Sequence, residues 1–305
     1  MSPEPASRRV LVTGAAGMLG SQLLRTAPAG VEAVGTDLRA APERDDGPGV
    51  DAVGVDLAEP DQVAGLLDFA GPFAGVIHGA AYTAVDRAEH EPELAERVNT
   101  VAAGVVAQAC AARDLPLLVV STDFVFDGRK RRPYAPEDPP APLGVYGRTK
   151  LAGERRALRA WPGGTRVVRT QWLYGPRGSH FPGTILRLAR ERHELSVVSD
   201  QVGSPTSTLE LAPALWDILL RGEPGIWHAA CEGSCSWYDL AVALLQEAGV
   251  IGCLLKPCTT EEFPRPAPRP AYSVLDCSRL TALRGQSLAP WRRALAEFLE
   301  HESGA

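Results

Sequence analysis

The chain has few of the features that mark membrane, secreted or disulfide-rich proteins. Its 305 residues include six cysteines and only 6% aromatic residues. No apolar stretch approaches the ~20 residues that a membrane helix needs, and Met1 to Arg9 have no apolar core of signal-peptide length. We therefore expect a cytoplasmic protein that does not bind membranes.

The cysteines do not form a metal-binding pattern. The pairs Cys231/Cys235 and Cys253/Cys258 are loosely spaced, and His228 is the only histidine near them. Zinc sites need closely spaced Cys and His ligands in matched pairs. We predict free, reduced thiols and no metal.

Strong positive charge is also absent. The net charge is −6, and the only basic cluster is the short run Arg129-Lys130-Arg131-Arg132, which reads as a solvated loop. A nucleic-acid-binding domain usually carries a basic face or stripe, so we expect no nucleic-acid partner. The 45% hydrophobic and 22% charged residues are ordinary for a soluble globular protein.

The first half of the chain alternates short apolar runs with segments of helical spacing. This pattern predicts an α/β fold with a Rossmann-type, doubly wound parallel sheet. The expected strands are residues 10–13, 31–37, 52–56, 75–79, 115–120 and 166–169. The expected helices between them are residues 17–27, 60–69, 93–113 and 146–161. Five prolines in residues 127–142 predict a long loop there.

Beyond Gly175 the pattern changes to helices separated by short strands. The expected helices are residues 184–193, 209–220, 237–248 and 290–300, and a proline-dense segment covers 263–270. We predict a nucleotide-binding domain over residues 1–175. A smaller α/β lobe over residues 176–305 would cap the carboxyl edge of the sheet, with some segments returning to the sheet.

A glycine-rich turn, Gly14-Ala-Ala-Gly17-Met-Leu-Gly20, follows the first expected strand and opens a helix. Glycines permit the tight turn and let the backbone approach a phosphate at the helix N-terminus. In this context the turn predicts a dinucleotide site. A purely structural turn is the alternative.

Asp37 ends the second expected strand, where a carboxylate accepts hydrogen bonds from a ribose 2′-OH and repels a 2′-phosphate. That favours NADH, whereas Arg39 could swing to meet the phosphate of NADPH, so both cofactors stay open. Asp37 capping a loop is the alternative. The full set of predicted cofactor contacts is Gly14, Gly17, Met18, Leu19, Gly20, Asp37, Arg39, Asp56, Leu57, Ala80, Ala81, Tyr82, Tyr146 and Lys150.

Tyr146 and Lys150 are four residues apart and so lie on one face of a helix. An ammonium beside a phenol favours phenolate, and we expect Lys150 to lower the pKa of Tyr146 toward neutrality. Thr122, at the end of the fifth expected strand, can donate to a substrate carbonyl oxygen. A nucleotide cofactor with a tuned proton donor is typical of a carbonyl reductase. An exposed helical pair without function is the alternative.

Several longer motifs resemble the extended short-chain dehydrogenase/reductases, and within them the dTDP-4-dehydrorhamnose reductase family. They run in order along almost the whole chain: Ala80-Ala-Tyr-Thr-Ala-Val-Asp-Arg-Ala-Glu89, Ser121-Thr-Asp-Phe-Val-Phe-Asp-Gly128, Val145-Tyr-Gly-Arg-Thr-Lys-Leu-Ala-Gly-Glu154, Arg169-Thr-Gln-Trp-Leu-Tyr-Gly175, Asp200-Gln-Val-Gly-Ser-Pro-Thr206, Ser236-Trp-Tyr238, and Arg269-Pro270 with Ser273.

The resemblance implies Thr122, Tyr146 and Lys150 as the catalytic residues. It also implies a set of substrate contacts: Val85, Asp123, Phe124, Trp172, Gln201 and Arg269. A guanidinium suits a diphosphate, which agrees with the place of Arg269, while Trp172 could instead be a core residue. The implied reaction is NADPH- or NADH-dependent reduction of the C4 ketone of a dTDP-4-keto-6-deoxyhexose, by a monomer or homodimer.

The chain departs from the family pattern at three places. Phe124 stands where the family usually has Tyr, His180 where Asn is common, and Tyr272 where an amide is common. These changes leave the catalytic residues intact and fit a variant reductase from an antibiotic-sugar pathway, such as one making a dihydrostreptose-type product. Phe124 disfavours a dehydratase, which needs Glu there. The alternatives are a nucleotide-sugar epimerase and a non-catalytic nucleotide-binding regulatory subunit.

Overall fold

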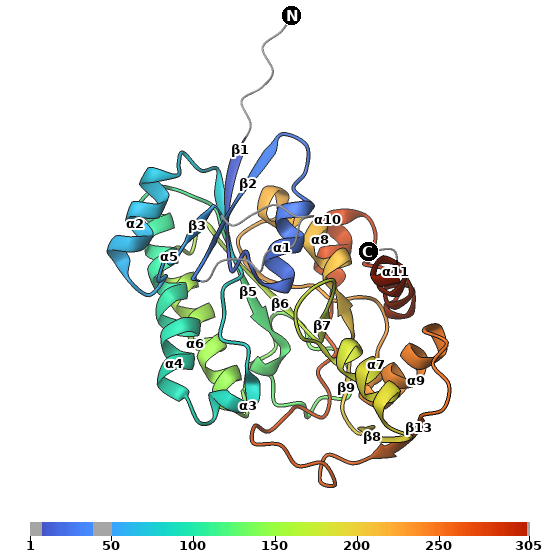
Figure 1. Ribbon diagram of the computed structural model, residues 1–305. Coiled ribbons are helices and arrows are strands. Elements are labelled where there is room, and N and C mark those ends of the chain that lie inside the picture. The colour runs from blue at the N-terminus through green and yellow to red at the C-terminus, as the bar shows by residue number, and fades with distance from the viewer. Residues whose placement is uncertain (1–7, 39–50, 304–305) are drawn as a thin grey trace, which may run out of the picture.

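A computed structural model describes residues 8–38 and 51–303 (Figure 1). Its centre is a seven-stranded sheet in the order β11-β6-β5-β4-β1-β2-β3, in which every neighbouring pair is parallel. The strands are β1 (Arg8–Thr13), β2 (Val31–Asp37), β3 (Ala52–Val53), β4 (Gly75–His78), β5 (Leu117–Thr122), β6 (Thr165–Thr170) and β11 (Gly225–His228). This confirms the predicted Rossmann-type α/β fold.

Helices cover both faces of the sheet, and alternate residues of each strand point to opposite faces. Val10 and Val12 of β1 belong to the core beneath α1 (Met18–Arg25) and α8 (Thr208–Arg221), while Leu11 belongs to the core beneath α2 (Pro60–Phe69) and α5 (Ala102–Ala111). The helices of the first half are α1 (Met18–Arg25), α2 (Pro60–Phe69), α3 (Val85–Ala88), α4 (Pro92–Glu96), α5 (Ala102–Ala111) and α6 (Val145–Ala160). Figure 1 shows α2, α4, α5 and α6 together on one side, and α1 with α8 on the other.

The rest of the chain adds two-stranded sheets and further helices, of which α8 covers a face of the main sheet (Figure 1). The two-stranded sheets pair β7 (Leu173–Tyr174) with β10 (Thr206–Ser207), β9 (Val202–Gly203) with β12 (Cys235–Ser236), and β8 (Glu194–Val198) with β13 (Leu254–Cys258). The helices are α7 (Phe181–Glu191), α8 (Thr208–Arg221), α9 (Trp237–Glu247), α10 (Ser278–Arg284) and α11 (Trp291–Ser303). A domain boundary at residue 175 stays a prediction.

Local sequence explains where several of these helices begin. The Ser207 hydroxyl accepts from the Leu209 N–H at the start of α8, and Ser236 forms a reciprocal capping box with Asp239 at the start of α9. None of the helices within the described ranges is long and apolar enough to span a membrane.

Some expected elements differ from those observed. The helix expected over residues 93–113 is interrupted by a π-helical turn, Arg97–Val101, between α4 and α5. The strand expected over 52–56 is only two residues long, because Gly54 adopts a left-handed φ of 84°. The helices α3 and α10 were not expected.

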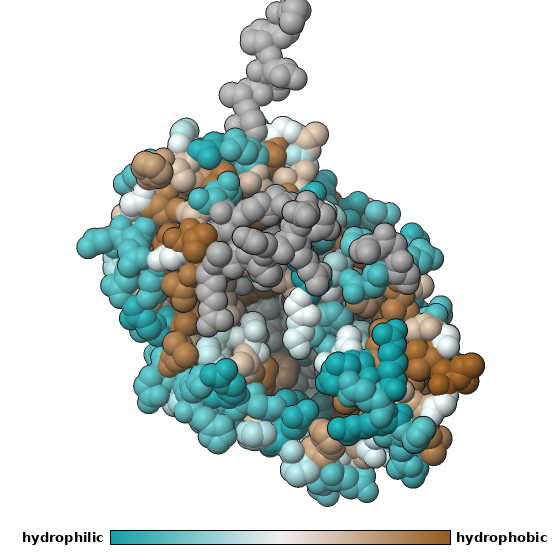
Figure 2. Space-filling view, viewed as in Figure 1, coloured by the Kyte–Doolittle hydropathy of each residue, from teal (hydrophilic) through white to brown (hydrophobic). Residues whose placement is uncertain are grey.

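The carboxyl ends of the strands form the edge where ligands bind in open α/β sheets, at the point where strand order reverses. Here the reversal lies between β1 and β4, which end at Thr13 and His78. β5 ends beside them at Thr122. The space-filling view shows a hollow on this side of the molecule, between the helices of the first half and the smaller C-terminal elements (Figure 2).

Candidate active site

The glycine turn between β1 and α1 has no room for larger residues. Gly14 has a left-handed φ of 71°, and a Cβ there would lie 2.8 Å from the Cα of Ala80. A Cβ on Gly20 would lie 2.1 Å from the Gly14 carbonyl oxygen. Exposed Gly17 is the N-cap of α1, without a side-chain cap, and Met18 and Leu19 begin the helix. This leaves a helix N-terminus open to a phosphate, as a dinucleotide cofactor requires.

Asp37 lies beside this turn. Its carboxylate accepts a hydrogen bond from the backbone N–H of Ala16 at 3.0 Å. The end of β2 therefore places an acidic group where the cofactor ribose is expected. Arg39, the other predicted residue here, lies outside the described residues.

Asp56 forms an ion pair and a backbone hydrogen bond within the chain. Its carboxylate pairs with Arg97 at 2.8 Å and accepts from the Ala58 N–H at 2.9 Å. These hydrogen bonds, that of Arg97 above all, lower the pKa of Asp56. Leu57 packs, half-buried, against the core beneath α2. A contact of either residue with adenine stays a prediction.

The segment after β4 is hydrogen-bonded to the end of β1 and to the π-helical turn. The Ala80 N–H donates to the hydroxyl of Thr13, and the Tyr82 N–H donates to Asn99. Ala81 lies between them and is half-buried. Asn99 was not selected from the sequence, although a polar Asn-Thr pair within a long apolar helix indicates a special role. π-helical turns often lie at functional sites.

Thr122 and Tyr146 meet where β5 ends and α6 begins. The Thr122 hydroxyl donates to Asp123 at 3.1 Å and accepts from the Phe124 N–H at 3.2 Å. A Cβ on Gly147 would lie 2.2 Å from the Phe124 carbonyl oxygen, so glycine lets α6 approach this turn closely. The rings of Phe124 and Tyr146 then pack edge to face, 5.5 Å apart.

The expected effect of Lys150 on Tyr146 is wrong for this arrangement. Burial raises the pKa of Tyr146 to about 12; a hydrogen bond with Thr122 acts in the opposite direction, and the charge of Asp123 raises it. Lys150 does not offset the burial, because its ammonium is bonded elsewhere, donating to the Val120 carbonyl oxygen at 2.7 Å. The phenol is therefore protonated at neutral pH, which is the form a proton donor needs.

The surroundings also tune Lys150 and its neighbours. Burial lowers the pKa of Lys150 to about 8, against the effect of Glu154. Burial and the charge of Lys150 lower the pKa of His78 to about 3, so His78 is neutral and its Nδ1 shares a hydrogen bond with Thr13 at 2.9 Å. Burial raises the pKa of Asp123 to about 6, and its Oδ2 has no hydrogen-bond partner among the described residues.

The predicted substrate contacts fall into two groups. Val85 begins α3, and Asp123 and Phe124 follow β5. Trp172, with a left-handed φ of 48°, stacks on Trp237 with ring centroids 3.5 Å apart. Gln201 accepts from the indole N–H of Trp237 at 3.2 Å. The stack therefore brings Trp172 and Gln201 together, which the sequence did not show. Their contact with substrate stays a prediction.

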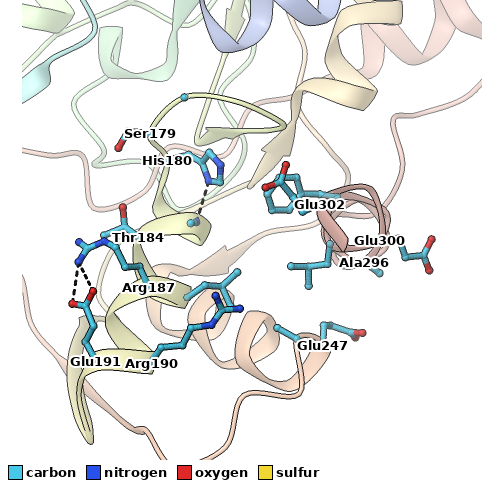
Figure 3. Close-up of a pocket in the computed structure, with 16 residues that line it drawn as sticks. Ser179, His180, Thr184, Arg187, Arg190, Glu191, Glu247, Ala296, Glu300 and Glu302 are labelled. Atoms are coloured by element: carbon cyan, nitrogen blue, oxygen red, sulfur yellow. Dashed lines mark hydrogen bonds and ion pairs between the residues drawn. The ribbon is translucent and has the colours of Figure 1, made fainter. Parts of the chain in front are cut away.

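A separate cavity of about 970 Å³ lies between α7, the end of α9 and α11. Figure 3 shows His180, Arg187 and Arg190 on one side of it and Glu300 and Glu302 on the other. None of the predicted site residues lines it. All six cysteines are free, and within the described ranges no group of three or more His, Cys, Asp or Glu lies where it could hold a metal ion.

The parallel sheet, the glycine turn and the Tyr–Lys helix beside β5 define an extended short-chain dehydrogenase/reductase. The family model of the RmlD substrate binding domain matches residues 8–303. A dTDP-4-dehydrorhamnose reductase from Mycolicibacterium smegmatis is 42% identical over 98% of this chain and 87% of its own length. The chain belongs to the dTDP-4-dehydrorhamnose reductase family.

Solved structures agree with this assignment. A dTDP-4-dehydrorhamnose reductase from Clostridium acetobutylicum superposes with a TM-score of 0.88 at 35% identity, over 97% of this chain and 99% of that one. The enzyme of the same name from Bacillus anthracis, solved in complex with NADP, gives a TM-score of 0.87 at 33% identity over the same shares.

Proposed function

We propose that the protein is an oxidoreductase that uses NADPH or NADH to reduce the C4 ketone of a dTDP-4-keto-6-deoxyhexose. The product is dTDP-L-rhamnose or a related sugar, such as a dihydrostreptose-type compound. The observation that carries the proposal is the meeting of Tyr146, still protonated, with Thr122 at the end of β5, on the same sheet edge as the glycine turn. The proposal also places the protein in the cytoplasm, as a monomer or homodimer.

Different residues of the chain bind the cofactor, hold the ketone oxygen and supply the proton. A reduced nicotinamide cofactor, when bound, supplies a hydride to the carbonyl carbon. Gly14, Gly17 and Gly20 leave room for its pyrophosphate, and Asp37 lies where its adenosine ribose is expected. The Thr122 hydroxyl turns its one proton from Asp123 to the ketone oxygen, and Tyr146 gives that oxygen its proton. The ketone thereby becomes an alcohol, and Tyr146 regains a proton from solvent.

Two features of this chain favour the direction of reduction. A phenol with a raised pKa stays protonated until charge develops on the ketone oxygen. As the phenolate forms, the Lys150 ammonium, one helical turn away, turns from the Val120 carbonyl oxygen toward it and stabilises its negative charge. We also expect Lys150 to hold the nicotinamide ribose hydroxyls.

The test is to incubate the purified protein with the dTDP-4-keto-6-deoxyhexose and each reductant, and to identify the product by NMR. The proposal predicts a C4 alcohol and one cofactor oxidised per sugar reduced. Interconversion of C4 epimers without net cofactor oxidation would indicate an epimerase instead. Cofactor binding without any turnover would indicate a regulatory subunit.

A further inference from the structure

A buried ion pair joins the helix of Tyr146 and Lys150 to the two strands beneath it. Glu154 lies one turn beyond Lys150 on α6, and its carboxylate receives two hydrogen bonds from Arg169, Nε to Oε1 at 3.0 Å and Nη2 to Oε2 at 2.7 Å. Both side chains are 2% exposed or less. The Ser121 hydroxyl donates to the same Oε1. Every oxygen of this buried carboxylate is therefore satisfied.

The strand register places these contacts next to the reacting groups. Ser121 of β5 lies directly beside Arg169 of β6, and Thr122 follows Ser121 in the chain. Lys150 donates to the carbonyl of Val120, one residue earlier. Lys150 and Glu154 thus fasten α6 to successive residues of β5, just before the strand reaches Thr122.

A buried ion pair contributes little net free energy to holding a helix in place. Removing two charges from water costs so much that well-packed apolar side chains of similar size are often as stable or more so. A buried carboxylate does something that an apolar residue cannot do, because its negative charge acts on the Lys150 ammonium one turn away. Glu154 opposes the effect of burial, which lowers the pKa of Lys150.

We propose that Glu154 is a positioning residue of the reductase: it sets α6 on the ends of β5 and β6, and its charge keeps the Lys150 ammonium protonated while Tyr146 gives up its proton. The inference rests on the proposed function, because it assigns Glu154 a part in that reaction. Glu154 itself is buried, one helical turn from Lys150, and acts through it.

The other ionisable groups nearby do not titrate in the same range as Lys150. They are Tyr146 on α6, His78 at the end of β4, Asp123 after β5, and His228 on β11, which lies beside Arg169 in the sheet. The pKa of Tyr146 is about 12 and that of Asp123 about 6, both raised by burial. Burial lowers the pKa of His78 and of His228 to about 3. A titration near pH 8 therefore belongs to Lys150, whose pKa is about 8.

The chain has only three lysines, at positions 130, 150 and 256, so each can be followed separately by NMR. We would label the lysine side chains with ¹³C, titrate the wild type and E154Q, and use Lys130 and Lys256 as internal references. The same two proteins would be assayed for the pH dependence of kcat/KM. E154Q keeps the shape of Glu154 and an oxygen acceptor but removes the charge.

The inference predicts that E154Q lowers the titration midpoint of Lys150 by about one pH unit or more, the usual effect of losing a close opposite charge. The alkaline limb of kcat/KM should move down by the same amount, which for one unit gives about fivefold less activity at the wild-type midpoint and about tenfold less well above it. The control is A157G, which weakens α6 at a buried position without changing charge. It should move neither curve.

A second variant covers the case in which E154Q fails to fold. E154M/R169M replaces the buried pair with apolar side chains, which buried pairs often tolerate, and should also lower the Lys150 midpoint, by less than E154Q because the positive charge of Arg169 is removed as well. If the wild type is active and a folded variant has the same Lys150 midpoint as the wild type, the inference about Glu154 is overturned and the proposed function stands. A wild type that reduces no 4-keto sugar overturns the proposed function, and with it the part of Glu154 in the reaction.

Discussion

Arg269 and Asp86 form a two-point ion pair across 183 residues of sequence, with 3.0 Å from Nη2 to Oδ2 and 3.0 Å from Nη1 to Oδ1. The Ala267 N–H donates to the same carboxylate. Asp86 follows Val85 at the start of α3, so the pair fastens the proline-dense segment 263–270 beside a predicted substrate contact.

Replacing Arg269 tests whether this segment holds the diphosphate. Arg269→Met should raise the KM for the dTDP sugar roughly 10- to 100-fold, because a hydrogen bond to a charged group contributes about 1.5–3 kcal/mol. Steady-state kinetics at saturating cofactor would measure it. Arg265→Met is the matched control, since Arg265 is exposed and lies 3.7 Å from Asp86. Equal KM values for the wild type and Arg269→Met would remove Arg269 from the substrate site.

Asp37 should control the choice of cofactor. Asp37→Asn keeps an oxygen that can accept from the Ala16 N–H but removes the charge that repels a 2′-phosphate. The ratio of kcat/KM for NADPH to that for NADH should rise, as it should for Asp37→Ala. Asp37→Ala should also weaken both cofactors, because the hydrogen bond to the glycine turn is lost. An unchanged ratio in both variants would exclude Asp37 from the ribose site.

The activity should depend on pH through Lys150 rather than Tyr146. The pKa of Lys150 is about 8 and that of Tyr146 about 12. As the pH rises through about 8, Lys150 loses the charge that stabilises the forming phenolate, and kcat/KM for reduction should fall. A profile that stays flat for more than a full unit above that pH would contradict this assignment.

Asp123 should lower the stability of the folded protein at neutral pH. Burial raises its pKa from 3.8 to about 6, so the neutral form is favoured on folding. The stability that this form contributes is present below about pH 3.8 and is lost as the pH rises through about 6. Asp123→Asn should therefore raise the free energy of unfolding at pH 7–8, on the order of 1–3 kcal/mol for an unsatisfied buried group.

Denaturant unfolding of the wild type and Asp123→Asn at several pH values would check this. The difference between the two should shrink as the solution is made more acidic than about pH 6. A gain that is the same at every pH would show that the charge of Asp123 is not its cause. Activity should fall in the same variant if Asp123 contacts the sugar.

The elements that sequence predicted best are those with a strong local pattern. β2 and α2 have the predicted bounds, because an apolar run and a proline at the first helical turn mark their ends. The two-residue strands were not predictable, because each exists only by pairing with a partner far along the chain. Gly54 shortened β3 through its backbone conformation, which the apolar run around it concealed.

The candidate site shows the same division between local and tertiary information. The four-residue spacing of Tyr146 and Lys150 placed both on one face of α6. The spacing could not show that burial outweighs the ammonium or that Lys150 is bonded to Val120. Glu154 was within reach of sequence reasoning, since it continues the same helix face, but its partner Arg169 is known only once β6 is placed beside β5.

The proposed mechanism depends above all on Tyr146 giving its proton to the ketone oxygen during reduction. Single-turnover oxidation of NADPH by the dTDP-4-keto sugar, compared between wild type and Tyr146→Phe, tests it most directly. The rate for Tyr146→Phe should be lower by ~10²–10⁴, with unchanged NADPH affinity. Tyr174→Phe, which removes a buried phenol of the C-terminal part, should retain the wild-type rate. A Tyr146→Phe protein that reacts as fast as the wild type would show that Tyr146 is not the proton donor.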